Sequence, residues 1–186
     1  MKKVFALILA LVMCFALVGC GEDENASPSP DVVEPAVGFS ASDLVLKNGD
    51  KEYKCDVYID DIIADFGEDY VYSEAMSCAY DGMDKVYGYG EANIDFSTRP
   101  DGDKDIVCEM YVHGGDWETS KGIKLGSSRE QVIEAYGEPT QETNFMFYYI
   151  LPASNAESEG ASLYFEFQDN AVNAIGVTAE QLIGEE

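Results

Sequence analysis

The sequence predicts an α+β fold built from two tandem units, in each of which a short helix packs on an antiparallel β-sheet. The chain matches itself when it is shifted by 70 residues, which lays residues 62–68 over residues 132–138. Apolar residues recur at helical spacing in both stretches, and segments rich in tyrosine and β-branched residues follow each of them. We expect the first unit over residues 41–115 and the second over residues 116–180.

The first predicted helix has a clear apolar face. That face consists of Ile59, Ile62, Ile63 and Phe66, at the i, i+3, i+4, i+7 spacing of a helix. Asp56 is expected to cap this helix at its start, and Gly67 to end it in a left-handed conformation. A helix of about ten residues is too short to be stable alone, so it must lie against a sheet.

The strands of the first unit follow from residue type and from turn signals. A hairpin is expected over residues 44–53, because Asn48-Gly49 is a strong two-residue turn. Longer strands are predicted over residues 70–80, 86–96 and 106–112. Residues 99–103 form a polar turn with proline and glycine, which joins the last two of these strands.

The second unit repeats the pattern. Val132, Ile133 and Tyr136 repeat the apolar face, while Ser127 and Glu130 fit a capping box at the start of that helix. Pro139 follows the helix and cannot continue it. Strands are predicted over residues 145–151, 163–167 and 171–177, with a turn at residues 168–170.

The N-terminal residues resemble the signal of a bacterial lipoprotein. Two lysines precede an uncharged apolar run over residues 4–17, and the run ends in Leu17-Val18-Gly19-Cys20. The resemblance implies that residues 1–19 are removed and that Cys20 is lipidated, which would hold the protein at the extracytoplasmic face of the cell membrane. Residues 20–40 are rich in proline, serine and acids and are expected to form a flexible tether. Residues 181–186 are expected to form an acidic tail.

The charge balance excludes one class of partner. The chain has a formal net charge of −25, and removal of residues 1–19 leaves nine basic and 36 acidic residues. Nucleic acids are bound through clustered lysine and arginine, which this chain lacks. The lipoprotein resemblance implies that the membrane is one partner, through the lipid on Cys20, and the other expected partner is an unknown envelope or extracellular protein.

The residues that carry catalysis or bind metals form no recognisable pattern. Three cysteines, Cys55, Cys78 and Cys108, remain in the folded part, and an odd number cannot all pair. The sequence therefore allows either one disulfide with one free thiol or three free thiols. His113 is the only histidine and has no nucleophile motif beside it. The acids in residues 101–105 alternate but lack the remainder of a calcium loop, so a hairpin turn is predicted there. No cofactor, metal or enzymatic activity is expected.

Aromatic residues are the candidates for partner recognition. Tyr87 and Tyr89 alternate along a predicted strand and therefore share one face, and Tyr80 is expected nearby. Tyrosine gives a large contact area at low entropic cost, although strand tyrosines also serve as packing residues. Trp117, in the connection between the units, is a further candidate and is expected to join the two units.

One motif of the second unit resembles a known family. The segment Gly122-Ile123-Lys124-Leu125-Gly126-Ser127, with Val132 and Tyr136-Gly137-Glu138-Pro139 after it, resembles a pattern of the β-lactamase inhibitory protein superfamily. The resemblance extends over roughly residues 44–178, and the small lipoproteins of outer-membrane assembly look like single-copy relatives. It implies helices on one face of an antiparallel sheet and a noncatalytic protein- or peptide-binding role.

Two other functions stay open. The family resemblance also implies inhibition of a secreted or envelope enzyme. A hydrolase that uses an acidic pair such as Asp60-Asp61 is a remote alternative.

Overall fold

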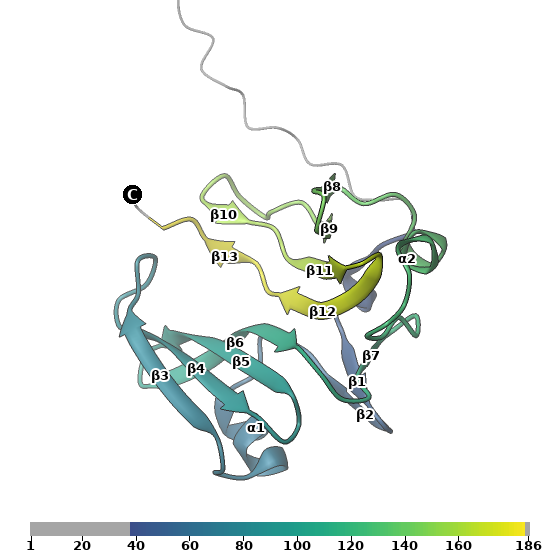
Figure 1. Ribbon diagram of the computed structural model, residues 1–186. Coiled ribbons are helices and arrows are strands. Elements are labelled where there is room, and N and C mark those ends of the chain that lie inside the picture. The colour runs from purple at the N-terminus through teal and green to yellow at the C-terminus, as the bar shows by residue number, and fades with distance from the viewer. Residues whose placement is uncertain (1–37, 185–186) are drawn as a thin grey trace, which may run out of the picture. The chain divides into compact units, whose positions relative to one another are not determined.

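The computed structural model describes residues 38–184, which form an α+β fold with one large antiparallel sheet (Figure 1). The eight strands of this sheet lie in the order β3-β4-β5-β6-β12-β11-β9-β8. Their bounds are β3 Val71–Met76, β4 Met83–Tyr89, β5 Ile94–Asp101, β6 Lys104–Val112, β8 Gln141–Glu142, β9 Met146–Ile150, β11 Ser162–Gln168 and β12 Ala171–Thr178. The sheet therefore contains strands from both halves of the chain, which meet where β6 pairs with β12.

Two smaller sheets flank the large one. Strands β1 (Leu46–Asn48), β2 (Lys51–Tyr53) and β7 (Glu118–Thr119) form a three-stranded sheet, so the predicted Asn48-Gly49 hairpin also pairs with the connection between the halves. Strands β10 (Ser158–Glu159) and β13 (Gln181–Leu182) form a two-stranded sheet. The first two residues of the expected acidic tail therefore pair as a strand. A short 3-10 helix, η1 (Ala41–Asp43), precedes β1.

The two predicted helices form, and the first ends at the expected glycine, but Gly67, with a ψ angle of −171°, does not adopt the expected left-handed helical conformation. Helix α1 spans Ile59–Phe66 and helix α2 spans Arg129–Tyr136. Gly67 and Gly137 follow them with φ angles of 85° and 79°, and each glycine N–H donates to the carbonyl of the isoleucine four residues earlier at 2.8 Å. The positive φ angle explains why glycine stands at both positions.

Both predicted N-caps are wrong. Helix α2 is capped by Ser128, whose side chain accepts from the Gln131 N–H, and not by Ser127. Ser127 is instead paired with β12, since its carbonyl accepts from the Val172 N–H at 2.8 Å. In α1 the cap position is Tyr58, because Asp56 adopts φ 62° and its N–H donates to the Val107 carbonyl at 2.9 Å.

One predicted strand is two strands in the structure. The stretch 86–96 turns back on itself after β4, and the turn over residues 90–93 places Tyr89 opposite Ile94 in β5. Asn93 takes φ 56° in this turn. The predicted polar turn at residues 99–103 is shorter than expected, because Asp101 still pairs with Lys104 and only residues 102 and 103 connect the strands.

The hydrophobic core covers one face of the large sheet. Cross-strand neighbours on this face, all buried except Tyr72 at the sheet edge, form a row: Tyr72, Tyr87, Phe96, Met110, Val177, Leu163 and Tyr149. Phe66 of α1 packs on Phe96, and Tyr136 of α2 packs on Tyr149. Both helices therefore cover the same face.

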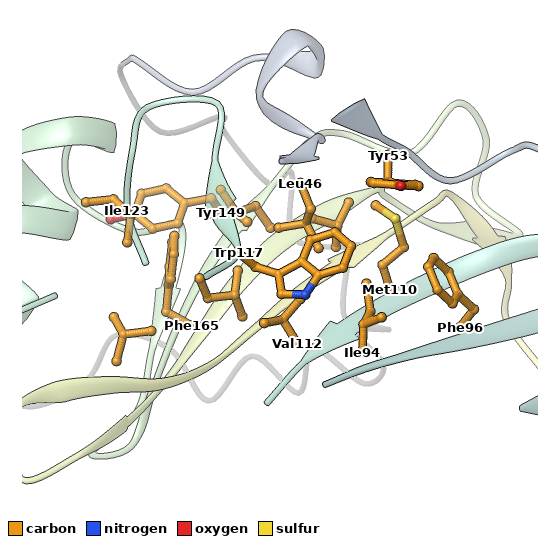
Figure 2. Packing of buried hydrophobic residues seen from close by; sticks show 14 of the residues in the cluster. Leu46, Tyr53, Ile94, Phe96, Met110, Val112, Trp117, Ile123, Tyr149 and Phe165 are labelled. Carbon is orange, nitrogen blue, oxygen red and sulfur yellow. The ribbon is translucent and has the colours of Figure 1, made fainter. Parts of the chain in front are cut away.

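Trp117 lies at the centre of this core and is fully buried. In Figure 2 its indole has Ile123, Tyr149 and Phe165 of the second half to one side and Tyr53, Phe96 and Met110 of the first half to the other. Its Nε1–H donates to the Ala92 carbonyl at 2.7 Å.

The predictions for the N-terminus fall outside the described residues. These are the signal peptide over residues 1–19, the lipidated Cys20 and most of the tether over residues 20–40. Among residues 38–184, neither helix has the length and apolar character needed to cross a membrane.

Candidate binding face

The predicted recognition residues are mostly buried. Tyr87 is 6 % exposed, Tyr89 4 % and Trp117 0 %, so these three are core residues and form no accessible patch. Tyr87 and Tyr89 do share one face of the sheet, as expected, but it is the face that α1 covers. Tyr80 is half-buried away from them, where its hydroxyl accepts from the Leu182 N–H at 3.0 Å.

Three partly accessible tyrosines lie on the opposite face of the sheet. Register places Asp95, Tyr111, Gly176, Tyr164 and Tyr148 in one row across β5, β6, β12, β11 and β9. Their burial alternates with that of the core residues, and the three tyrosines are half-buried. We call the surface formed by Tyr111, Tyr148 and Tyr164 with Asp95, Glu109 and Glu166 the tyrosine face. Within residues 38–184, neither helix packs on it.

Gly176 sets the orientation of the central ring. A Cβ at this position would fall within the van der Waals radius of the Tyr164 ring, so the ring lies directly over the glycine. The ring centroids of Tyr111 and Tyr148 are 6.4 and 5.8 Å from that of Tyr164, with interplanar angles of 29° and 35°. The three rings thus form a continuous aromatic surface across four strands.

Hydrogen bonds hold this surface in place. The Tyr164 hydroxyl donates to Glu109 Oε1 at 2.7 Å, and the Ser97 hydroxyl donates to Glu109 Oε2 at 3.1 Å. Burial, followed by the charge of Glu109, raises the pKa of Tyr164 well above its usual value. Burial and the charge of Glu166 raise the pKa of Tyr111 in the same way. Both hydroxyls therefore remain protonated donors at neutral pH.

His113 lies at the border of the tyrosine face. Its Nε2 is 3.7 Å from Asp95 Oδ1, and its ring centroid is 6.2 Å from that of Tyr111. No serine or cysteine among the described residues forms a hydrogen bond with it. The imidazole side chain is 39 % exposed.

A cavity of about 430 Å³ opens at one end of the tyrosine face. Glu109 and Ser97 line it together with Tyr80, Cys78 and Cys108. Burial raises the pKa of the Cys108 thiol to about 12, so this sulfur is a neutral thiol and a poor nucleophile at neutral pH. Cys55, Cys78 and Cys108 are all free thiols in the structure.

The part of the chain that the structure describes was searched for a metal site, and the whole chain was compared with known proteins. Among the described residues, no group of three or more histidine, cysteine or acidic side chains is arranged to hold a metal ion. Asp101 and Asp105 are paired strand residues on either side of the predicted hairpin turn. Comparison of the chain with protein-family models, curated proteins and solved structures found no match.

The tyrosine face was missed because the sequence shows alternation without showing which side is covered. Tyr111 alternates with Met110 and Val112, and Tyr148 and Tyr164 alternate with large buried neighbours in the same way. The period of two separates the faces of a strand. Only the position of the helices decides which face is accessible.

Proposed function

We propose that this chain is a noncatalytic binding protein of the cell envelope, held at the extracytoplasmic face of the membrane by lipid on Cys20, and that its tyrosine face binds a protein or peptide. The observation that carries the binding role is an ordered aromatic surface that neither helix within residues 38–184 covers. The proposed anchor depends on the motif Leu17-Val18-Gly19-Cys20 and on the polar stretch that follows it.

The composition of the tyrosine face suits polypeptide recognition. Tyrosine contributes large contact area with few rotatable bonds, and it is enriched among residues that dominate binding energy. The hydrogen bond from Tyr164 to Glu109 fixes its ring before a partner arrives. A surface ordered in advance loses less entropy on binding, which favours affinity.

The groups that catalysis would need are placed for other roles. The Cys108 thiol is buried with a raised pKa. Asp60 and Asp61 lie exposed in the first turn of α1, where carboxylates favour the helix dipole. These placements support binding over an acid-pair hydrolase.

We also propose that the two halves are copies of one unit, as the superfamily resemblance implies. The Tyr89 hydroxyl donates to the Gly67 carbonyl at 3.0 Å, and the Tyr149 hydroxyl donates to the Gly137 carbonyl at 2.9 Å. Each bond joins the second strand after a helix, β4 or β9, to the glycine that ends that helix.

The segment before each helix supports the same proposal. The Asp56 N–H donates to the Val107 carbonyl of β6 at 2.9 Å, and the Gly126 N–H donates to the Val172 carbonyl of β12 at 2.8 Å. Asp56 and Gly126 both have positive φ angles, 62° and 85°. Asp56 thus takes the place in the first copy that glycine holds in the second.

If the halves are copies, the two tyrosine–glycine bonds should contribute alike. Tyr89→Phe and Tyr149→Phe are each expected to lower the free energy of unfolding by about 1–2 kcal/mol, because each leaves a carbonyl without its donor. Urea unfolding followed by circular dichroism measures the change. The matched control is Tyr87→Phe, since the Tyr87 hydroxyl donates to no other described residue. A large loss in one variant with no loss in the other would contradict equivalent roles.

Affinity capture with the full chain tests the binding role. The double variant Tyr111→Ser/Tyr148→Ser removes two rings from the tyrosine face, and Tyr72→Ser removes an exposed tyrosine on the other side of the sheet. We expect wild type and Tyr72→Ser to retain the same envelope protein. Recovery by the double variant should fall by roughly tenfold or more, because truncating a central interface tyrosine costs about 2 kcal/mol.

The capture experiment also separates the possible outcomes. Equal recovery by all three proteins would show that the tyrosine face is not the binding surface. If the retained partner is a secreted or envelope enzyme, its activity is assayed with wild type and with the double variant. Loss of activity only with wild type would establish the inhibitor function that the superfamily resemblance implies.

A further inference from the structure

We propose that the partner presents a basic segment to the tyrosine face, with lysine or arginine side chains lying on the tyrosine rings and their charges beside Asp95, Glu109 and Glu166. This inference rests on the proposed function, which assigns a polypeptide partner to the same surface. It adds the chemistry that the partner must offer.

The charge of the sheet favours a cationic partner. Residues 130–186 contain eleven acidic residues and no lysine, arginine or histidine, so strands β8, β9, β11 and β12 carry no cation of their own. In the other half, Lys85 pairs with Asp105 at 2.8 Å and Arg99 is directed to Asp56 at 3.5 Å. Within residues 38–184, no lysine or arginine forms an ion pair with a carboxylate of the tyrosine face.

Each ring of the tyrosine face has a carboxylate close to it. Asp95 is the cross-strand neighbour of Tyr111, and Glu109 accepts the hydrogen bond of Tyr164. Glu166 lies two residues from Tyr164 on the same strand face, next to Met146 and near Tyr148. A long basic side chain can therefore rest its apolar stem on a ring while its charge reaches a carboxylate.

Contacts between a basic side chain and an aromatic ring occur at other places in the chain. Lys104 lies over the Tyr58 ring at 4.3 Å, Lys121 over Tyr136 at 4.6 Å and Arg129 over Phe167 at 4.2 Å. Arg99 lies over Tyr80 at 5.3 Å. Among the described residues, no cation occupies the rings of the tyrosine face, which leaves these rings available to a partner's cations.

Fluorescence anisotropy with three labelled peptides tests the inference on the full chain. The probes are a peptide of alternating arginine and serine, its citrulline counterpart and its glutamate counterpart. Citrulline keeps the shape of arginine without its charge. We expect the arginine peptide to bind at least roughly tenfold more tightly than the citrulline peptide at low ionic strength, and the difference to shrink as salt screens the charges.

Charge and ring variants locate the contact. Asp95→Asn/Glu166→Gln should weaken arginine-peptide binding by roughly threefold to tenfold, while the matched control Glu52→Gln/Glu134→Gln removes the same charge elsewhere and should change it less than about twofold. Tyr148→Leu should weaken binding by roughly threefold, and Tyr148→Phe should preserve it because the ring remains.

The outcomes distinguish this inference from the proposed function. Equal weakening by both charge pairs would mean diffuse attraction to an acidic protein and would overturn the inference. Equal affinity for the arginine and citrulline peptides would also overturn it. If the inference fails while Tyr111→Ser/Tyr148→Ser still loses its captured partner, the binding role stands with a partner of other chemistry. If that capture also fails, the binding role fails with it.

Discussion

Replacing Trp117 with alanine is expected to lower the free energy of unfolding by about 3–5 kcal/mol. Trp117 is fully buried, with ring centroids 5.3 Å from Tyr53 and 6.3 Å from Phe66. Its removal creates a cavity where the two halves share their core (Figure 2). It also leaves the Ala92 carbonyl without the donor that reaches it at 2.7 Å. Because small domains are stable by only about 5–15 kcal/mol, the loss would be a large share of the total.

Urea unfolding followed by far-ultraviolet circular dichroism measures this effect. Tryptophan fluorescence is unsuitable, because Trp117 is the only tryptophan of the chain. Trp117→Phe is the matched control: it keeps an aromatic ring but loses the hydrogen bond, so we expect a loss of about 1–3 kcal/mol. We also expect one cooperative transition, since β6 and β12 join the halves in a single sheet. A change below about 1 kcal/mol for Trp117→Ala would contradict its role at the centre of the core.

The helices could be predicted because their signals are local. The apolar stripe of α1 and the glycine after it are both contained in a few consecutive residues, and α1 begins at Ile59 as expected. The cap of α2 could not be chosen in the same way. Ser127 with Glu130 and Ser128 with Gln131 both fit a capping box. Pairing of Ser127 with Val172 of β12 decides between them, and that contact is distant in sequence.

The sequence predicts that tyrosines form the candidate site, but it does not predict which tyrosines. Alternation correctly places Tyr87 and Tyr89 on one side of a strand, and tyrosine is the residue that forms the accessible surface. Which tyrosines are accessible depends on where α1 and α2 pack, and Phe66 packs on the side that contains Tyr89. The candidate recognition residues therefore lie on β6, β9 and β11, and not on β4 as the sequence predicted.

The order of the strands in the large sheet could also not be predicted from the sequence. Tyr111 and Tyr164 come from different halves, and they become neighbours only because β6 pairs with β12 beside β11. An aromatic surface built across this junction depends on both halves. The same pairing therefore produces both the shared core and the continuous aromatic surface.

Stability is expected to fall steeply as the pH rises from about 10 to about 12, because buried tyrosines must stay protonated in the folded protein. Burial, followed by neighbouring groups, raises the pKa of Tyr87 and of Tyr89 to about 12. Burial also raises the pKa of Tyr149 and Tyr164. In the unfolded chain a tyrosine has a pKa near 10.

The direction of the effect follows from proton binding in the two states. Below about pH 10 both states keep these phenolic protons, so the contribution to stability is complete. Between about pH 10 and 12 the unfolded chain releases them while the folded protein retains them, and unfolding becomes more favourable. Each group ceases to add to the loss once the pH exceeds its folded pKa.

Urea unfolding at successive pH values, together with tyrosinate absorbance, tests this expectation. The buried tyrosines should ionise in step with the loss of circular dichroism, because they release their protons only when the chain unfolds. Tyr87→Phe removes one of the buried phenols and should reduce the alkaline loss of stability, with little change at neutral pH because no hydrogen bond of that hydroxyl is lost. A free energy of unfolding that stays constant from about pH 10 to 12 would show that the tyrosines of the core ionise as readily in the folded protein as in the unfolded chain.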